Sequence, residues 1–422
     1  MNKQMILGCV GDDFTGSSDA ASFLVNAGMK TVLLNGIPKE LPNIDCDAII
    51  IALKTRSIEK TLAVKESLEA LAWLSEHGAK HLYIKYCSTF DSTPAGNIGP
   101  IIDAALEKYD EQYTMLCPAL PVNKRIVRHG ELWVDDVLLA ESAMKNHPLN
   151  PMWASDIAEL IKPQGKYPCL KIPYEMLDSR SLSEIKKHIA DYASINDRFY
   201  IIPDYISEEH AKKIAEIFGQ CKILTGGSGV LTELAKYYNK TKIPCKQYIK
   251  SSVGGRGILL AGSCSKATLA QIACFQSSGG VSYKIDPLAL LNKTMTVEMI
   301  WQFVEDHQSD TVLLYSSAPS DVVQLNQQYG RDKIANIIEQ VMAELGKKAY
   351  KAGIKKIIVA GGETSGAVTQ ALGFNAFIIG ESIAPGVPIM APVQDESVRL
   401  VLKSGNFGDN DFFNTAINKT KR

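Results

Sequence analysis

The sequence of 422 residues has no long hydrophobic run and no excess of charge of either sign. A membrane-spanning helix needs about 18 consecutive apolar residues, and no segment of the chain comes near that length. Forty-five basic against 46 acidic residues leave a formal net charge of −1. This balance removes the general attraction to nucleic acid or anionic lipid that a strongly basic chain would have. We therefore expect neither a nucleic-acid partner nor a membrane partner.

Patterns typical of disulfides, bound metals and export are also missing. The nine cysteines are scattered singly with no C-x-x-C, and the seven histidines include no H-E-x-x-H. These spacings predict reduced, mostly buried cysteines and no metal site in the protein itself. Asp12 and Asp13 interrupt the first apolar segment too early for the core of a signal peptide, so we expect a cytoplasmic location.

Several catalytic signatures are absent as well. No G-x-x-x-x-G-K-[ST] is present, which excludes a P-loop enzyme, and no G-x-G-x-x-G follows the first apolar segment, which argues against a nicotinamide dehydrogenase. A G-x-S-x-G turn is missing too, so acyl transfer has little support.

What the chain does have is a regular alternation of short apolar segments with segments of helical period. This alternation is typical of α/β folds with parallel sheets. The expected helices include 58–76 and 97–107. The expected strands are residues 5–10, 31–34, 48–52, 82–85, 113–117, 222–225, 258–261, 311–315, 356–360, 376–379 and 398–403.

The length is about three times that of a ~150-residue domain, and a polar stretch at 240–255 predicts the boundary between two domains. We expect two α/β lobes, residues 1–245 and 255–422, each with a mainly parallel sheet flanked by helices. The active site is expected in the cleft between them, a usual place for a small-molecule site. The proline-punctuated stretch 118–152 is expected to be irregular, with one hairpin through 128–131.

Charged residues accumulate at turns where expected strands lead into helices. Such turns bind anions through free N–H groups, although any one of them is more often only structural. The combination is more informative here, because Asp12, Asp13, Arg56 and Lys85 all follow or end apolar strands. Ligands gather at the carboxyl ends of parallel strands. The set predicts a site for a polar, anionic small molecule.

Taken in order, the turns and the blocks around them resemble the four-carbon acid sugar kinase family over the full length. The blocks are D-D-F-T-G-S-S-D at 12–19, T-R-S at 55–57, K-Y-C-S-T-F-D-S-T at 85–93, P-A-L-P at 118–121, H-P-L-N-P-M at 147–152, G-G-S-G at 226–229, G-G-E-T-S-G at 361–366 and K-S-G-N-F-G at 403–408. Within the family, the sequence of segments 85–93, 96–99 and 147–152 is most similar to that of the 3-oxo-tetronate kinases.

The resemblance implies a sugar-acid-binding N-terminal lobe and a nucleotide-binding C-terminal lobe. It implies ATP-dependent phosphorylation of the C4 hydroxyl of a 3-oxo-tetronate in four-carbon acid sugar catabolism, with Mg²⁺ accompanying ATP. The nucleotide-binding residues it implies are Ser263, Gly361, Gly362, Glu363, Thr364 and Gly405. The negative charge of Glu363 would be unfavourable beside a triphosphate, unless its carboxylate contacts ribose or a water bound to Mg²⁺.

For the sugar acid, Arg56 and Lys85 are expected to hold the carboxylate, because Arg offers a planar bidentate grip and Lys a point charge. Ser88 and Asp91 are expected beside them as further substrate contacts. Asp12 or Asp13 is the expected catalytic base, with Asp91 in reserve, since a loose phosphoryl-transfer transition state needs proton removal only late.

Five further residues have alternative or purely structural assignments. Asp19 either joins the site or complements the helix dipole from the first turn of its helix. Lys124 and Arg125 either close over the transferred phosphate or, as we favour, are surface charges. His129 and His147 are expected to be structural.

Other activities stay open on the sequence alone. The chain could be a threonate or erythronate kinase of the same family, or a keto-acid lyase or aldolase that uses Lys85 as a Schiff base. A two-lobed sugar-acid-binding protein without enzymatic activity is a further alternative. The sequence also leaves open whether the chain forms a homo-oligomer.

Overall fold

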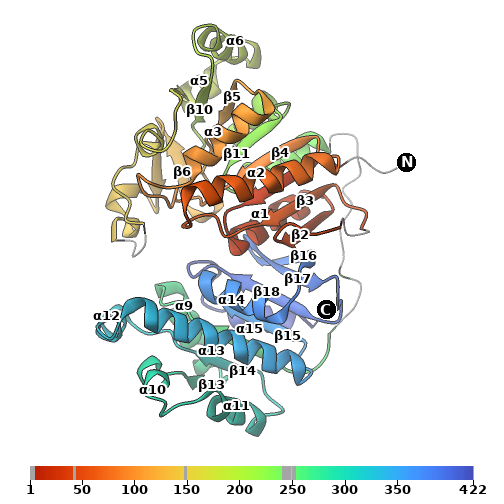
Figure 1. Ribbon diagram of the computed structural model, residues 1–422, viewed down its shortest axis with the longest axis vertical. Coiled ribbons are helices and arrows are strands. Elements are labelled where there is room, and N and C mark those ends of the chain that lie inside the picture. The colour runs from red at the N-terminus through yellow and green to blue at the C-terminus, as the bar shows by residue number, and fades with distance from the viewer. Residues whose placement is uncertain (1–4, 41–43, 147–149, 240–248, 250–252, 422) are drawn as a thin grey trace. The chain divides into compact units, whose positions relative to one another are not determined.

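The computed structural model describes residues 5–40, 44–146, 150–239, 249 and 253–421. Contacts between Cα atoms divide the chain into two compact units, Met1–Gln247 and Tyr248–Arg422. Each unit is built around its own arrangement of strands flanked by helices (Figure 1). Among the described residues, no helix combines the length and the apolar character needed to cross a membrane.

The first unit contains a parallel sheet in the strand order β11-β4-β1-β3-β2. Its strands are β1 (Leu7–Gly11), β2 (Thr31–Asn35), β3 (Ala48–Ala52), β4 (His81–Lys85) and β11 (Ile223–Gly226). Its helices are α1 (Phe14–Asn26), α2 (Lys60–Glu76), α3 (Ile98–Tyr109), α4 (Ile157–Ile161), α5 (Tyr174–Ser179), α6 (Leu182–Ala193), α7 (Glu208–Phe218) and α8 (Leu231–Tyr238). Strands β1, β3 and β4 are buried at every position, as expected for strands of a parallel sheet.

Two small sheets complete the first unit. One is parallel, in the order β5-β10-β9, and the other is an antiparallel meander, β6-β7-β8. Their strands are β5 (Tyr113–Met115), β6 (Arg125–Arg128), β7 (Glu131–Val134), β8 (Val137–Leu138), β9 (Cys169–Ile172) and β10 (Phe199–Pro203), and short 3₁₀ turns lie at Pro121–Asn123, Leu139–Glu141 and Ala143–Asn146. The expected hairpin is confirmed as β6–β7. The stretch around it is more regular than expected, because β8 extends the hairpin into a meander.

The second unit holds a mixed sheet in the order β16-β17-β18-β15-β12-β14-β13. Its strands are β12 (Gly257–Ala261), β13 (Val281–Lys284), β14 (Val312–Tyr315), β15 (Lys356–Ala360), β16 (Ala376–Ala384), β17 (Val387–Pro392) and β18 (Arg399–Lys403). Its helices are α9 (Lys266–Ser277), α10 (Pro287–Leu291), α11 (Val297–Asp306), α12 (Ser320–Gln327), α13 (Arg331–Lys351), α14 (Gly362–Leu372) and α15 (Phe412–Lys419). Strands β13, β14, β12, β15 and β18 are parallel, while β17 is antiparallel to both of its neighbours.

The mainly parallel α/β architecture predicted from the sequence is therefore confirmed in both units. The core of the second unit gathers apolar side chains from its central strands and from α9 and α15, including Leu259, Ile358, Val401 and Phe412. Burying such a side chain contributes on the order of 1.5–3 kcal/mol. The expectation of mostly buried cysteines is wrong, because Cys9 and Cys117 alone are fully buried among the eight described cysteines, all of which are free thiols.

Candidate active site

The conspicuous turns of the first unit lie together because the strands before them are neighbours. Gly11 at the end of β1 is in register with Ala52 of β3 and with Lys85 of β4, and Lys85 is in register with Gly226 of β11. Parallel strands end at one edge of a sheet, where ligands gather. Four blocks that are far apart in sequence thus meet along this edge, which we call the N-terminal strand-end cluster: residues 12–19, 55–57, 85–93 and 226–229.

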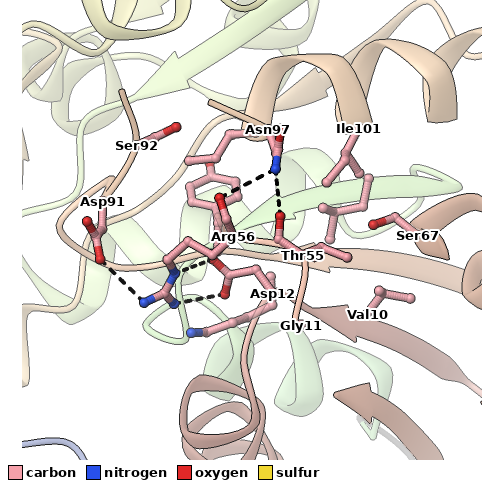
Figure 2. Close-up of a pocket in the computed structure, with 14 residues that line it drawn as sticks. Val10, Gly11, Asp12, Thr55, Arg56, Ser67, Asp91, Ser92, Asn97 and Ile101 are labelled. Atoms are coloured by element: carbon pink, nitrogen blue, oxygen red, sulfur yellow. Dashed lines mark hydrogen bonds and ion pairs between the residues drawn. The ribbon is translucent and has the colours of Figure 1, made fainter. Parts of the chain in front are cut away.

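The centre of this cluster is the Arg56 guanidinium, which lies among three aspartates (Figure 2). Nε and Nη2 of Arg56 donate to the two carboxylate oxygens of Asp12 at 2.8 and 3.0 Å. Nη2 also pairs with Asp13, and Nη1 lies 3.4 Å from Asp91 Oδ2. Burial alone would lower the pKa of Arg56, but Asp12 and Asp13 outweigh it and raise the pKa. The bidentate face that could grip a substrate carboxylate is occupied by Asp12 in this structure.

The backbone that carries Arg56 is fixed by Asn97, which precedes α3. Its Nδ2 donates to the carbonyl oxygens of Thr55 at 2.8 Å and Ile58 at 2.9 Å. Asn97 was not among the predicted site residues, although it lies in the segment 96–99 that supported the resemblance. The cavity beneath these side chains has a volume of about 20 Å³ (Figure 2), which accommodates about one water. It is too small to hold a sugar acid.

Lys85 provides a buried positive charge next to this network. It is the last residue of β4 and only 4% exposed. Its ammonium group lies against Gly16, where a Cβ atom would overlap Lys85 Nζ and lie 3.0 Å from Asp13 Oδ1. Burial by itself would lower the pKa of Lys85, yet the carboxylates of Asp12, Asp13 and Asp19 outweigh it and raise the pKa above its ordinary value. Lys85 is therefore a permanent cation at neutral pH.

Asp13 combines a structural and an electrostatic position. It is the N-cap of α1, where its Oδ1 accepts from the Gly16 N–H, and its other oxygen pairs with Arg56. Burial would raise the pKa of Asp13, but Arg56, Lys85 and the Gly16 N–H together lower it. The carboxylate is ionised at neutral pH and is a weak base.

Ser88 and Asp91, the other two predicted substrate contacts, are both buried within the cluster. Arg125 Nη1 donates to Ser88 Oγ at 2.9 Å, and Asn150 Nδ2 donates to Asp91 Oδ1 at 2.7 Å. Arg125 is half-buried, so the expectation that it is a surface charge is wrong, whereas Lys124 is exposed.

Asp19 is more deeply buried than its position in the sequence suggests. It lies in the second turn of α1, so its expected place in the first turn is wrong. One oxygen accepts from Ser228 Oγ, and the other has no hydrogen-bond partner among the described residues. Burial raises the pKa of Asp19 to about 6, although Lys85 and Ser228 act in the opposite direction.

Of the two histidines that were expected to be structural, only His129 lies in the described part of the chain. His129 lies on the β6–β7 turn, where its backbone N–H donates to Asp204. His147 lies outside the described residues.

In the second unit, three turns that are distant in sequence converge. Gly361 N donates to Lys403 O at 2.9 Å. A Cβ on Gly361 would lie 3.1 Å from Ser263 N and 3.2 Å from Thr364 Oγ1, and a Cβ on Gly405 would overlap Ser263 Oγ. The structure thus brings together Ser263, Gly361, Thr364 and Gly405, with Gly362 and Glu363 exposed beside them. We call this group the C-terminal turn cluster.

The N-terminus of α14 within this cluster is suited to an anion. Its N-cap Gly361 has a φ of 129°, which L side chains rarely adopt, and no side chain caps the helix. The N–H groups of its first turn are therefore available, and the helix dipole favours negative charge there. By contrast, the neighbouring helix α9 is capped by Ser265.

No group of three or more His, Cys, Asp or Glu side chains among the described residues is placed to hold a metal ion. Asp12, Asp13 and Asp91 already pair with Arg56. The described side chains therefore do not fit a preformed magnesium cage, and Mg²⁺ would have to arrive with the phosphates of a nucleotide.

Comparisons with known proteins match the two parts of the chain to two different domain families. One protein-family model, described as a sugar-binding N-terminal domain, matches residues 7–234, and another, a nucleotide-binding C-terminal domain, matches residues 258–413. A relative from Burkholderia multivorans, named 3-oxo-tetronate kinase, is 39% identical over 416 residues, covering 98% of this chain and 96% of the relative. The chain belongs to the four-carbon acid sugar kinase family.

Other members of the family with the same name are similar over their whole lengths. The one from Pectobacterium atrosepticum is 40% identical over 421 residues, covering 96% of this chain and 97% of that protein. The one from Salmonella typhimurium is 39% identical over 412 residues, covering 96% of this chain and 97% of that protein.

Two solved structures share the fold at 38% identity. One, from Salmonella typhimurium LT2, has a TM-score of 0.88 with 98% of this chain and 99% of that one covered. The other, from Haemophilus influenzae, has a TM-score of 0.78 with 97% and 98% covered. The Salmonella structure bears a provisional tRNA synthase name, whereas the curated Salmonella relative at a similar identity is named a kinase.

Proposed function

We propose that this protein is an ATP-dependent 3-oxo-tetronate kinase. It would phosphorylate the C4 hydroxyl of a 3-oxo-tetronate (3-dehydro-erythronate or 3-dehydro-threonate) to give 3-oxo-4-phosphotetronate in four-carbon acid sugar catabolism. The observation that carries this proposal is the similarity to relatives named 3-oxo-tetronate kinase, which extends over 96–98% of the chain and so includes both clusters.

The proposal divides the work between the two parts of the chain. Residues 1–245 form the sugar-acid-binding domain, with Arg56, Lys85, Ser88 and Asp91 as substrate contacts. Residues 255–422 form the nucleotide-binding domain, with ATP held at the C-terminal turn cluster. The expected cleft between the lobes and the cytoplasmic location stay predictions.

In the N-terminal strand-end cluster, Lys85 is the group best suited to a substrate carboxylate. Its positive charge is maintained by three surrounding carboxylates, and no hydrogen bond or ion pair engages its ammonium group among the described residues. Arg56 is held by Asp12 in the structure, so it would orient the aspartates and add charge unless the substrate displaces Asp12.

Asp12 or Asp13 would accept the proton from the C4 hydroxyl. The pKa of Asp13 is lowered by the neighbouring cations, which makes it a weak base. A weak base is sufficient where the phosphoryl group moves through a loose transition state, because the hydroxyl loses its proton late. Positioning of the two substrates then contributes more to the rate than proton abstraction.

In the C-terminal turn cluster, the N–H groups at the start of α14 would hold the phosphates of ATP, together with Ser263 and Gly405. Magnesium would supply further neutralisation of phosphate charge as part of the nucleotide complex. Glu363 is exposed in the first turn of α14, which leaves its side chain free to turn toward ribose or solvent.

The raised pKa of Lys85 argues against the aldolase alternative. Schiff-base formation needs a neutral amine, and lysines that perform it are activated by a lowered pKa. At Lys85 the surrounding carboxylates act in the opposite direction. The kinase proposal instead uses Lys85 as a permanent charge.

A coupled ADP-release assay over the 3-oxo-tetronates, threonate and erythronate tests the proposal. We expect the highest kcat/KM with a 3-oxo-tetronate. A higher value with threonate or erythronate would assign the chain to another member of the family. Absence of ADP with every substrate would refute the kinase, and covalent trapping by borohydride without ATP would then support the lyase, whereas a ligand-induced thermal shift without turnover would support a binding protein.

A further inference from the structure

Lys403 is a buried lysine with no carboxylate partner among the described residues. It ends β18 at the carboxyl edge of the sheet, and its side chain is 0% exposed. No carboxylate among the described residues forms an ion pair with it, and burial lowers its pKa to about 7. A buried charge is unfavourable unless it is paired. Its position within the C-terminal turn cluster indicates that the missing anion belongs to a ligand.

The ammonium group of Lys403 is fully used as a donor. Its Nζ donates to Thr268 Oγ1 at 3.1 Å, to Ser404 O at 3.0 Å and to Gly405 O at 2.8 Å. The carbonyl oxygen of Gly405 also accepts from Ser265 Oγ at 2.6 Å and from Thr268 Oγ1 at 3.0 Å. Two consecutive carbonyl groups are therefore drawn toward Lys403, and hydroxyl groups of α9 reinforce the second.

The direction of these carbonyl groups determines the direction of the next two N–H groups. In a trans peptide the C=O and the following N–H point to opposite sides, and no cis peptide occurs in the described chain. The N–H groups of Gly405 and Asn406 therefore point away from Lys403. Neither has a hydrogen-bond partner among the described residues. Successive free N–H groups of this kind form anion-binding concavities.

We infer that Lys403 is a positioning residue for the nucleotide: it holds the carbonyls of Ser404 and Gly405 inward so that the N–H groups of Gly405 and Asn406 bind phosphate oxygens. The inference deepens the proposed function and rests on its assignment of ATP to this cluster. Gly405 packs against Ser263, and Lys403 O accepts from Gly361 N. The two N–H groups thus belong to the same cluster as the uncapped N-terminus of α14.

Lys403→Met tests the inference, and Lys356→Met is its matched control. Lys356 is also buried, at 1% exposed, but it begins β15 and so lies at the opposite end of the same sheet. We expect Lys403→Met to weaken binding of ADP and of pyrophosphate, measured by calorimetry, at least tenfold. In steady-state assays the KM for ATP should rise while the KM for the sugar acid stays unchanged. Lys356→Met should bind both probes as the wild type does.

Wild-type affinity in Lys403→Met, or an equal loss in both variants, would overturn the inference. If Lys403→Met does not fold, Thr268→Val provides the test, because it removes a hydroxyl that bonds both Lys403 and Gly405 O and preserves the side-chain shape. At least a threefold loss of ADP affinity is expected, and no loss would overturn the inference. If pyrophosphate binding depends on Lys403 but the wild-type protein forms no ADP, the kinase proposal is refuted and the inference about Lys403 stands. Binding of neither probe would refute both.

Discussion

At the scale of single residues, the N-terminal strand-end cluster is governed by the balance between burial and charge. Arg56 and Lys85 are both kept charged in a buried setting because carboxylates surround them. Asp13 is kept ionised by the same cations, while at Asp19 burial outweighs the neighbouring cations and raises the pKa. Two aspartates of one cluster therefore differ in pKa according to whether burial or the neighbouring cations dominate.

The assignment of the base can be tested by Asp12→Asn and Asp13→Asn, made separately. Asn caps a helix about as well as Asp, so Asp13→Asn should preserve α1. At least one variant should lose 100-fold or more in kcat, within the range typical of a general base, with ADP affinity unchanged. Near-native turnover in both variants, measured by ADP release, would show that neither aspartate is the base.

The burial of Asp19 predicts a pH-dependent difference in stability. In the unfolded chain Asp19 loses its proton near 3.8, whereas in the folded protein its pKa is about 6. Between these values the folded state binds more protons, so the contribution of Asp19 to stability falls as the pH rises. Relative to the wild type, Asp19→Asn should gain about 2 kcal/mol between pH 4 and pH 6 and about 0.4 kcal/mol more by pH 7.5, where the difference levels off.

Urea denaturation at pH 4, 5, 6 and 7.5 measures this difference. Asp110→Asn is a suitable control, because the Asp110 side chain is 96% exposed and pairs with Arg198 rather than with a histidine. A difference between Asp19→Asn and the wild type that does not change with pH would contradict the burial effect.

At the scale of elements, the β6–β7 hairpin depends on one buried carboxylate. His129 and Gly130 adopt φ values of 53° and 77° at its two-residue turn, the sign required by a type I′ turn. Asp204 is 0% exposed and accepts from the N–H groups of His129 at 2.6 Å, Gly130 at 2.8 Å and Tyr174 at 3.0 Å. Asp204 therefore links the hairpin to Tyr174, the first residue of α5.

Asp204→Ala should destabilise the protein by about 3 kcal/mol or more, because each buried N–H left without an acceptor costs about 1–3 kcal/mol. The same hairpin begins with Arg125, which contacts Ser88, so the KM for the sugar acid should rise as well. Urea denaturation and steady-state kinetics measure the two effects. A loss no larger than that of Asp178→Ala, whose carboxylate is 59% exposed, would contradict the role of Asp204.

Elements set by local sequence were predicted well, and those set by distant pairing were not. The apolar run 48–52 coincides with β3, and the 128–131 hairpin is present. The antiparallel strand β17 and the edge strand β13 were not expected, and β5 belongs to a separate small sheet. Strand direction and sheet membership depend on contacts across the fold, which local periodicity does not contain.

The same distinction applies to individual side chains of the two clusters. Strand-end position placed Asp12, Arg56 and Lys85 correctly at one sheet edge. The burial of Asp19 could not be predicted, because its partner Ser228 is 209 residues away in sequence. The sequence identified Lys403 only as the first residue of a glycine-containing turn. Its burial could not be predicted, because it depends on contacts with Thr268 of α9 and Phe412 of α15.

At the scale of the whole molecule, both units place their functional turns at the carboxyl edge of a mainly parallel sheet. The first unit gathers charged side chains there, whereas the second gathers backbone N–H groups and hydroxyls around Ser263, Gly361 and Gly405. Charged side chains suit a small acid, and free N–H groups at a helix N-terminus suit phosphates. The difference in chemistry between the two edges is the physical basis for assigning one substrate to each.

A crystal structure of the full chain with a non-hydrolysable ATP analogue and the sugar acid tests this assignment most directly. The account predicts nucleotide density against Ser263, Gly361 and Gly405, and sugar-acid density against Lys85. Nucleotide density at Lys85, or no nucleotide at the C-terminal turn cluster at concentrations that support turnover, would contradict it.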